Sequence, residues 1–393
     1  MLSCVTGLSF RCHGEAVGIV CFKVSMKNPT YVLFPLFLAL VSLKSLSSQG
    51  NESLTDKLWN LPQVYEDEEN PYIQDFEFLG YVQHQMGWVD SDRGNFEDSE
   101  FRRFRLGTRT RFLREWYLFN LIDVDPVEGQ FYENITLAYL TWSPFGNSLS
   151  DRKKFQITGG KLKVFFTREF IQTPKRIKTL ERSLMVNYHL PEFATGGWVS
   201  GEAGDYRYMV ALLSGDKEKE FSQFEHGGLF HGKLDRDYGE DWNVCLGVVL
   251  ADEEQQIISG IDVGVSLSAV YNEEYKNGNF SFLGDFIATS GEGDTADTYG
   301  IILMPSWQLH NSLEFVTRLQ LASASEPDGL RLQKRYERLA GDFRGENYTA
   351  GYVGLNYFIR GHHLKLMSGL EFSQMDQGAF DGHTWFLGSR MFF

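Results

Sequence analysis

The chain has 393 residues, of which 15% are aromatic and 23% charged, and its formal charge is −15. After residue 45 no apolar run approaches the ~20 residues that a membrane-spanning helix needs, which excludes an ordinary helical membrane protein. Only one of the four cysteines, Cys245, lies beyond residue 25, so a disulfide-stapled secreted scaffold is excluded as well. A soluble protein or a transmembrane β-barrel remains, because alternating lipid-facing and lumen-facing residues average out in hydropathy.

The N-terminal residues predict a segment that targets the protein for secretion. In residues 26–48, Met26 and a lysine precede an apolar run from Tyr31 to Leu43, and small residues follow. This is the order of a secretory signal peptide, and the apolar run is too short for the alternative, a single membrane anchor. Residues 1–25 contain three cysteines without the Cys-x-x-Cys spacing typical of zinc sites. We expect them to be an extension that precedes the true start at Met26.

Residues 49–75 are polar and acidic and contain two prolines, so we expect a periplasmic lead-in there. From residue 76 to 393 the pattern changes to alternating apolar and polar residues separated by Gly, Asn, Asp and Glu. Clear examples lie at residues 261–270, 312–321 and 363–373. In the second, Leu313, Phe315, Leu319 and Leu321 oppose Glu314, Arg318 and Gln320; in the third, Leu364, Leu366, Leu370 and Phe372 oppose Lys365 and Glu371. A period of two places such sets on opposite faces of a sheet.

A soluble β-sandwich would also alternate. However, many of these runs reach the roughly ten residues of a tilted membrane strand, whereas strands of soluble proteins peak near about 5–6. Aromatic residues stand near the ends of the runs, where membrane barrels carry interfacial girdles: Trp116, Tyr117, Tyr139, Trp142, Trp198, Tyr206, Tyr208, Trp242, Tyr271, Trp307, Tyr357 and Trp385. At about 20 residues per strand and loop, residues 76–393 predict an all-β, transmembrane antiparallel barrel of about 16 strands.

The last strand carries the most specific local signal. In residues 384–393, Trp385, Leu387, Met391 and Phe393 share one face. A terminal Phe on an alternating strand resembles the assembly signal of outer-membrane barrels, although a Phe can also end a strand by chance. We therefore expect the outer membrane of a Gram-negative-type bacterium, with its lipid and the barrel assembly machinery as partners.

A basic zone stands out from the acidic background: residues 101–182 hold sixteen Lys and Arg against eight Asp and Glu. Arg103, Arg105, Arg109 and Arg111 share one face of a predicted strand. Lipid-facing arginine costs about 2–4 kcal/mol near the midplane of the membrane, which predicts that these four line the lumen. Guanidinium groups there could bind anions, or they could pair with lumen carboxylates such as Glu115 or Glu133 and brace the wall.

A second basic stretch becomes irregular after a short strand at residues 155–161. We expect the loop that follows to fold into the pore and narrow it, because rings of Arg or Lys select anions and phosphate. The alternative is an ordinary solvated extracellular loop. The residues expected at this constriction are Lys161, Lys163, Arg168, Lys175, Arg176 and Lys178.

At these positions the sequence resembles the phosphate-selective porin O and P family. Residues 101–111 resemble the basic strand of that family, and residues 160–166 resemble its Gly-Gln-x-Lys-x-Pro-Phe segment, with Lys161 in place of Gln and Phe165 in place of Pro. Residues 181–183 match Glu-Arg-Ser, and residues 197–213 fit the glycine-rich strand pair that follows. The resemblance implies a sixteen-stranded, trimeric barrel whose basic constriction passes phosphate or polyphosphate, and it also points to Lys163.

The predicted function is therefore passive diffusion of small anions, with no cofactor, no metal and no nucleic acid as partner. A general porin without phosphate selectivity, a barrel-type outer-membrane hydrolase and a plugged structural barrel are the alternatives. No Gly-x-Ser-x-Gly, His-Glu-x-x-His or phosphate-binding Gly-rich loop is present, so no enzyme is predicted. His362 and His363 are adjacent on a strand and face opposite ways, which disfavours a metal site.

Overall fold

The computed structural model describes residues 59, 62–125, 131–144, 154–188, 190–215, 220–225, 227–252, 255–256, 262–293, 297–333, 335–376 and 379–393. The predicted extension and signal peptide lie outside the described residues. The predicted lead-in is described only at residue 59 and from residue 62 onwards, where it contains strand β1 (Gln63–Glu66) and the start of β2. No helix within these ranges is long and apolar enough to cross a membrane.

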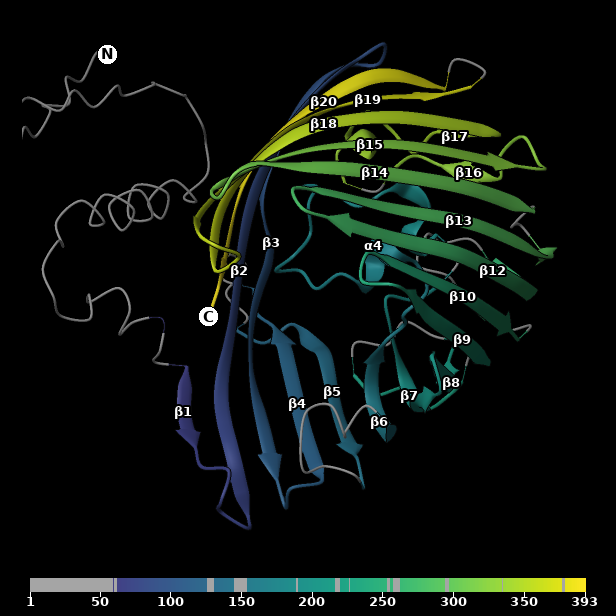
Figure 1. Ribbon diagram of the computed structural model, residues 1–393. Helices are drawn as coiled ribbons and strands as arrows, with labels where there is room; N and C mark the ends of the chain where they lie inside the picture. The colour runs from purple at the N-terminus through teal and green to yellow at the C-terminus, as the bar shows by residue number, and fades with distance from the viewer. Residues whose placement is uncertain are drawn as a thin grey trace, which may run out of the picture. The chain divides into compact units, whose positions relative to one another are not determined.

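Sixteen antiparallel strands form a closed barrel, which confirms the predicted fold class (Figure 1). They are β2 (Ile73–Ser91), β3 (Gly94–Phe112), β4 (Trp116–Asp123), β5 (Asn134–Trp142), β6 (Phe155–Lys163), β7 (Phe193–Ala203), β8 (Tyr206–Ser214), β9 (Gly228–Tyr238), β10 (Trp242–Ala251), β12 (Asp262–Asn277), β13 (Phe280–Gly293), β14 (Thr298–His310), β15 (Leu313–Ala324), β18 (Asn347–Arg360), β19 (Leu364–Met375) and β20 (Phe380–Phe392). Two short strands, β1 and β11 (Gln255–Gln256), extend the same sheet.

The barrel closes because β2 pairs with β3 on one side and with β20 on the other. At the seam, Gly80 and Phe393 exchange both backbone hydrogen bonds, each 3.0 Å long. The Phe393 ring lies over Gly80, where a Cβ atom would come within 1.9 Å of it. The terminal Phe thus packs against the first barrel strand, and only glycine leaves room for it.

The two ends of the barrel differ in the length of their connections. On the side of the chain terminus, β7 and β8, β9 and β10, β12 and β13, and β14 and β15 are joined by turns of two or three residues. On the opposite side, residues 164–192 join β6 to β7, and residues 325–346 join β15 to β18. Outer-membrane barrels have short periplasmic turns and longer extracellular loops, and this pattern predicts that the terminus lies at the periplasmic end.

Exposure alternates along the strands as predicted. On β15, Leu319 and Leu321 are exposed while Arg318 and Gln320 are buried, and on β19 Phe372 is exposed while Lys365 and Glu371 are buried. Near the turns, an outward chain of ring contacts crosses five strands through Trp242, Tyr275, Phe280, Trp307 and Phe315. This chain fits an interfacial girdle.

Three aromatic residues assigned to the girdles are exceptions. Tyr117, Tyr139 and Trp198 alternate with the exposed Leu118, Leu140 and Val199, and therefore face the lumen. The prediction was wrong for these three because position near the end of a run does not tell which face a side chain occupies.

The loop of residues 164–192, here called the inner loop, contains α4 (Arg168–Ile171) and η3 (Leu184–Asn187). Its apolar side chains, among them Phe166, Phe170 and Leu180, belong to the main buried cluster together with inward residues of the strands. Figure 1 shows α4 on the inner side of the strands. The β15–β18 loop, residues 325–346, contains β16 (Leu330–Arg331), η4 (Glu337–Leu339) and β17 (Arg344–Gly345), and its Leu330, Leu332 and Tyr336 join the same cluster.

Candidate functional site

Inward polar groups of the wall fix the start of the inner loop. Asp285 on β13 accepts hydrogen bonds from the backbone amides of Arg168, at 2.5 Å, and Glu169, at 3.0 Å. The Thr167 hydroxyl caps the same turn by accepting from the amide of Phe170 at 3.2 Å. Asn272 on β12 donates to the carbonyl of Phe166 at 3.2 Å. These bonds satisfy the amides at the start of α4, which its own turns leave unpaired.

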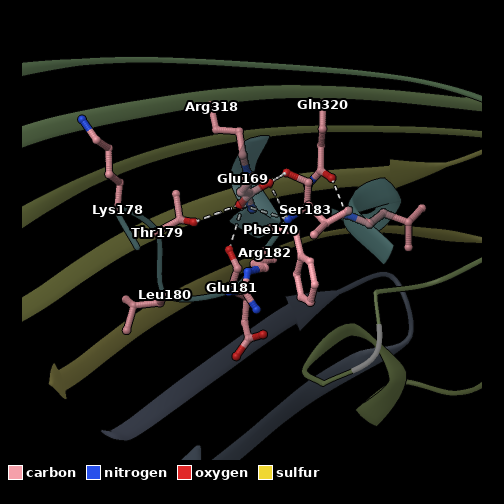
Figure 2. Close-up of polar contacts among 12 residues, drawn as sticks. Glu169, Phe170, Lys178, Thr179, Leu180, Glu181, Arg182, Ser183, Arg318 and Gln320 are labelled. Carbon is pink, nitrogen blue, oxygen red and sulfur yellow. Dashed lines mark hydrogen bonds and ion pairs between the residues drawn. The ribbon is translucent and has the colours of Figure 1, made fainter. Parts of the chain in front are cut away.

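Arg318 on β15 ties the middle of the inner loop to the wall (Figure 2). Its Nη1 donates to Glu169 Oε1 at 2.9 Å, to the Thr179 hydroxyl at 3.2 Å and to the carbonyl of Glu181 at 2.8 Å. Its Nη2 pairs with Glu371 on β19 at 2.5 Å. The side chains of all three charged residues are at most 3% exposed. A buried guanidinium between two carboxylates is tolerable only because its hydrogen bonds are made in this way.

Each residue of the Glu-Arg-Ser segment, residues 181–183, makes contacts of its own. The amide of Ser183 donates to Glu169 Oε1 and Oε2 at 3.3 and 3.2 Å, and its hydroxyl also contacts Glu169. Glu181 pairs with Arg102 at 3.5 Å and accepts a hydrogen bond from Gln85. Arg182 lies over the ring of Phe170, with Cζ 4.8 Å from the ring centre. Figure 2 shows Glu181, Arg182 and Ser183 together with Glu169 and Phe170.

Three further strands hold the stretch before that segment. Arg390 on β20 donates to the carbonyl of Leu180 at 2.8 Å, and Lys365 on β19 donates to that of Ile177. Asn356 on β18 donates to the carbonyl of Lys178 at 2.9 Å. The inner loop is therefore bound to a large arc of the wall, and it narrows the lumen from that side.

The predicted constriction residues divide into two kinds. Lys178 and Arg168 are occupied as anchors: Lys178 pairs with Glu314 at 2.9 Å, and Arg168 lies 3.8 Å from Asp235 and 3.9 Å from Glu274. The remaining four have other surroundings. Lys161 is buried, Lys163 contacts the inner loop, Lys175 lies 3.1 Å from His363, and Arg176 is exposed.

The four arginines of β3 also divide. All four face inward, but Arg105 pairs with Asp123 through bonds of 2.5 and 3.1 Å, and Arg109 pairs with Glu77. Arg111 pairs with Asp75 at 2.8 Å and with Glu68. The bracing alternative therefore describes these three, although the partners expected for them were wrong. Glu115 instead accepts a hydrogen bond from the indole of Trp142 at 2.9 Å.

Arg103 differs from the others, since no carboxylate contacts it among the described residues. It donates to Gln83 Oε1 at 2.8 Å, and the same oxygen accepts from Arg390 at 2.7 Å. The Nε atoms of both arginines are buried without a hydrogen-bond partner. Two guanidinium groups thus share one neutral acceptor, and Arg390 also donates to Gln85 Oε1 at 2.9 Å.

Arg102 was missed by the sequence analysis. Gln83 faces Arg103 and His84 faces Phe101 across the β2–β3 pair, so Arg102 is the extra residue of a β-bulge. A bulge breaks strict alternation and brings two successive side chains towards one face. Strict alternation places Arg102 on the face opposite Arg103, and nothing in the local sequence predicts the bulge.

These residues form a group that we call the basic cluster: Arg102, Arg103, Arg105, Lys163 and Arg182. Glu192, just before β7, lies among them. Burial would raise the pKa of Glu192, but Arg102, Arg182 and Arg103 outweigh it and lower the pKa to about 2. Lys163 lies with Nζ 4.3 Å from the centre of the Phe170 ring and 3.2 Å from the carbonyl of Gln172. Lys163 and Arg182 therefore share one aromatic ring.

The β15–β18 loop supports the basic cluster from the other side, which the sequence did not predict. Its Arg335 pairs with Glu100 at 2.5 Å and lies 3.6 Å from Glu181. Its Gln333 donates to the carbonyl of Arg182 at 3.3 Å. Arg102 and Arg335 outweigh burial and lower the pKa of Glu181, so that carboxylate is charged where the two loops meet.

Among the described residues, no group of three or more His, Cys, Asp or Glu side chains is placed to hold a metal ion. His363 donates from Nδ1 to the carbonyl of Phe392 at 3.1 Å and contacts Lys175. It thus packs at the periplasmic end of the last strand.

The part of the chain that forms the basic strand and the inner loop matches a known protein family. The family model for phosphate-selective porin O and P matches residues 79–233. This stretch contains the basic strand, the inner loop and the Glu-Arg-Ser segment, and the match confirms the resemblance predicted from them. No curated protein matches the sequence.

Solved structures share the fold at low sequence identity. An anion-selective porin from Comamonas acidovorans has a TM-score of 0.57 and 13% identity, covering 81% of this chain and 99% of its own. The outer-membrane channel DcaP of Acinetobacter baumannii has a TM-score of 0.58 and 9% identity, covering 84% and 100%. The trimer form of OmpT, an outer-membrane protein of Vibrio cholerae, has a TM-score of 0.53 and 10% identity, covering 81% and 99%. The chain has the closed-barrel fold of outer-membrane porins, and residues 79–233 match the phosphate-selective porin O and P family.

Proposed function

We propose that this porin lets small anions, inorganic phosphate among them, diffuse passively past the basic cluster. The observation that carries the proposal is the gathering of five cationic side chains at the junction of β3, the end of β6 and the inner loop. Arg105 is neutralised by Asp123 and Arg102 by Glu181, and Glu192 is the remaining carboxylate in the group. Cations therefore outnumber carboxylates where the inner loop narrows the lumen.

This excess favours anions for an electrostatic reason. In a narrow passage between low-dielectric walls the field of fixed charges is weakly screened, so a surplus of positive charge raises the local anion concentration and repels cations. Guanidinium groups also supply paired donors that suit the oxygens of phosphate. Arg109 and Arg111, nearer the end of β3, add less to the positive field, because Glu77 and Asp75 offset their charges.

The proposal includes no cofactor and no energy source. It also includes three copies of the chain per assembly, supported by the family resemblance and by the trimer form of a structurally similar protein. Delivery to the membrane by the barrel assembly machinery through Phe393 is part of the same proposal.

Lys163→Glu tests the proposal at the residue that both sequence and geometry single out. An inward carboxylate removes one attractive charge and adds a repulsive one, so chloride conductance and its block by phosphate should both fall. The matched control is Lys276→Glu, on an exposed lysine of β12 that pairs with Glu274 near the turn end of the barrel. Equal effects of the two substitutions on conductance and block would contradict a constriction at Lys163.

A further inference from the structure

The lumen contains an aromatic surface that the passage of inorganic ions does not explain. Tyr81, Tyr117, Phe119 and Tyr139 face inward on β2, β4 and β5, and Trp198 does so on β7; we call these five the lumen aromatic cluster. All five are partly exposed. The lumen side of a porin is normally polar, since apolar surface in contact with water is unfavourable.

Three members of the cluster, Tyr117, Phe119 and Tyr139, contact one another. The rings of Phe119 and Tyr139 lie 5.2 Å apart with planes inclined by 15°, and those of Tyr117 and Phe119 lie 6.4 Å apart, inclined by 22°. Offset, near-parallel rings are a favourable aromatic geometry, so Tyr117, Phe119 and Tyr139 form a stack to which a further flat ring can add.

Glycines leave room beside this surface. Gly160 on β6 is paired with Tyr139, and Gly196 on β7 is paired with Gly160, so the row next to the Tyr139 ring carries no side chain. Both glycines have positive φ, 135° and 155°, and a Cβ on Gly160 would lie 2.2 Å from the carbonyl of Ala138. Other residues are therefore disfavoured at both positions, so neither places a side chain beside Tyr139, while Trp198 contacts Phe165 of the inner loop with ring centres 5.4 Å apart.

Charged groups border the same surface. Arg109 is paired across the strands with Phe119, and its side chain is 42% exposed although it contacts Glu77. Two inward-facing rows further along the same strand pair, beyond Gly107 and Leu121, Arg105 and Asp123 form their ion pair. An exposed guanidinium beside flat aromatic faces offers a carboxylate its paired donors and a ring its stacking partner.

We infer that the lumen aromatic cluster binds cyclic organic anions that carry a flat ring and a carboxylate, on the periplasmic side of the basic cluster. The inference rests on the proposed function, because the basic cluster must admit the anion. The ring would stack on Phe119 and Tyr139, and the carboxylate would take up part of the hydrogen bonding of Arg109.

Single-channel recordings with benzoate and acetate as probes test this on the native protein. Benzoate should reduce the chloride current at a concentration about fivefold lower than acetate, because one aromatic contact contributes a factor of about 2 to 12 in affinity. Equal block by both anions in an anion-selective pore would overturn the aromatic site and leave the proposed function intact. A potassium-selective pore would instead overturn the proposed function.

A double variant, Phe119→Leu with Tyr139→Leu, locates the site. It should raise the half-blocking concentration of benzoate about fivefold or more and leave that of acetate unchanged. Phe78→Leu, on the exposed outer face of β2, is the matched control and should change neither. A heat-modifiable band on a gel shows that the double variant has folded, and unchanged benzoate block in it would exclude this surface as the site.

Discussion

Replacing Arg318 by methionine removes the central tie between the inner loop and the wall. The substitution keeps an unbranched apolar stem but deletes four hydrogen bonds, to Glu169, Thr179, the carbonyl of Glu181 and Glu371. It leaves the carboxylates of Glu169 and Glu371 at 2% and 3% exposure without their shared cation. Breaking a buried pair in this way typically costs about 3–5 kcal/mol.

The barrel wall has its own closed hydrogen-bonded sheet, so we expect this cost to appear as detachment of the inner loop. A cost of about 3 kcal/mol or more raises the detached population by a factor of about 10² or more. Single-channel recordings should then show frequent steps to a higher conductance, because the constriction opens when the loop leaves the wall. Arg318→Lys keeps the charge but loses the planar fork, and should show fewer steps.

Arg236→Met is the matched control, since it removes the guanidinium of Arg236, on β9, from its exposed pair with Asp205. It should leave the current trace unchanged, because exposed ion pairs contribute little. A steady native-like conductance in Arg318→Met would refute the reasoning that Arg318 holds the inner loop in the lumen.

Three further predictions follow from the seam and from the β15–β18 loop. Deleting Phe393 should lower outer-membrane levels and leave protein in the periplasm, measured by fractionation; normal levels would show that the terminal Phe is incidental. Gly80→Leu should act in the same direction, because its side chain would occupy the place of the Phe393 ring, and a normal heat-modifiable band would contradict that. Burial and Glu371 raise the pKa of Glu337 from 4.5 to about 7, so this carboxyl, bonded to Tyr348, stabilises the β15–β18 loop fully below pH 4.5 and progressively less as the pH rises through 7. Protease cleavage of that loop should therefore increase between pH 5 and pH 8 in the native protein but not in Glu337→Gln, and equal pH dependence in both would refute the assignment.

The wall was predictable from sequence because its physics is local. Alternation along β15 and β19 gave the outward Leu319 and Phe372 and the inward Arg318 and Glu371 without any knowledge of the neighbouring strands. A period of two reports only the face, however. It could not show that Arg318 and Glu371 meet around Glu169 of a loop about 150 residues away in the chain.

The candidate site was predictable in part. A basic irregular stretch after β6 indicated a loop in the pore, and Lys163 was identified from spacing and family resemblance. The bulge that adds Arg102 was not predictable, because it depends on the register between β2 and β3. Nor was the support from Arg335, since the β15–β18 loop has no periodicity that would indicate folding towards the lumen.

The zero-current potential across a KCl gradient in planar bilayers tests the central claim most directly. The excess of cationic side chains in the basic cluster predicts a potential of the sign that marks chloride as the more permeant ion. A potential of the opposite sign, which marks potassium as the more permeant ion, would contradict the account and show that the acidic remainder of the lumen outweighs the basic cluster.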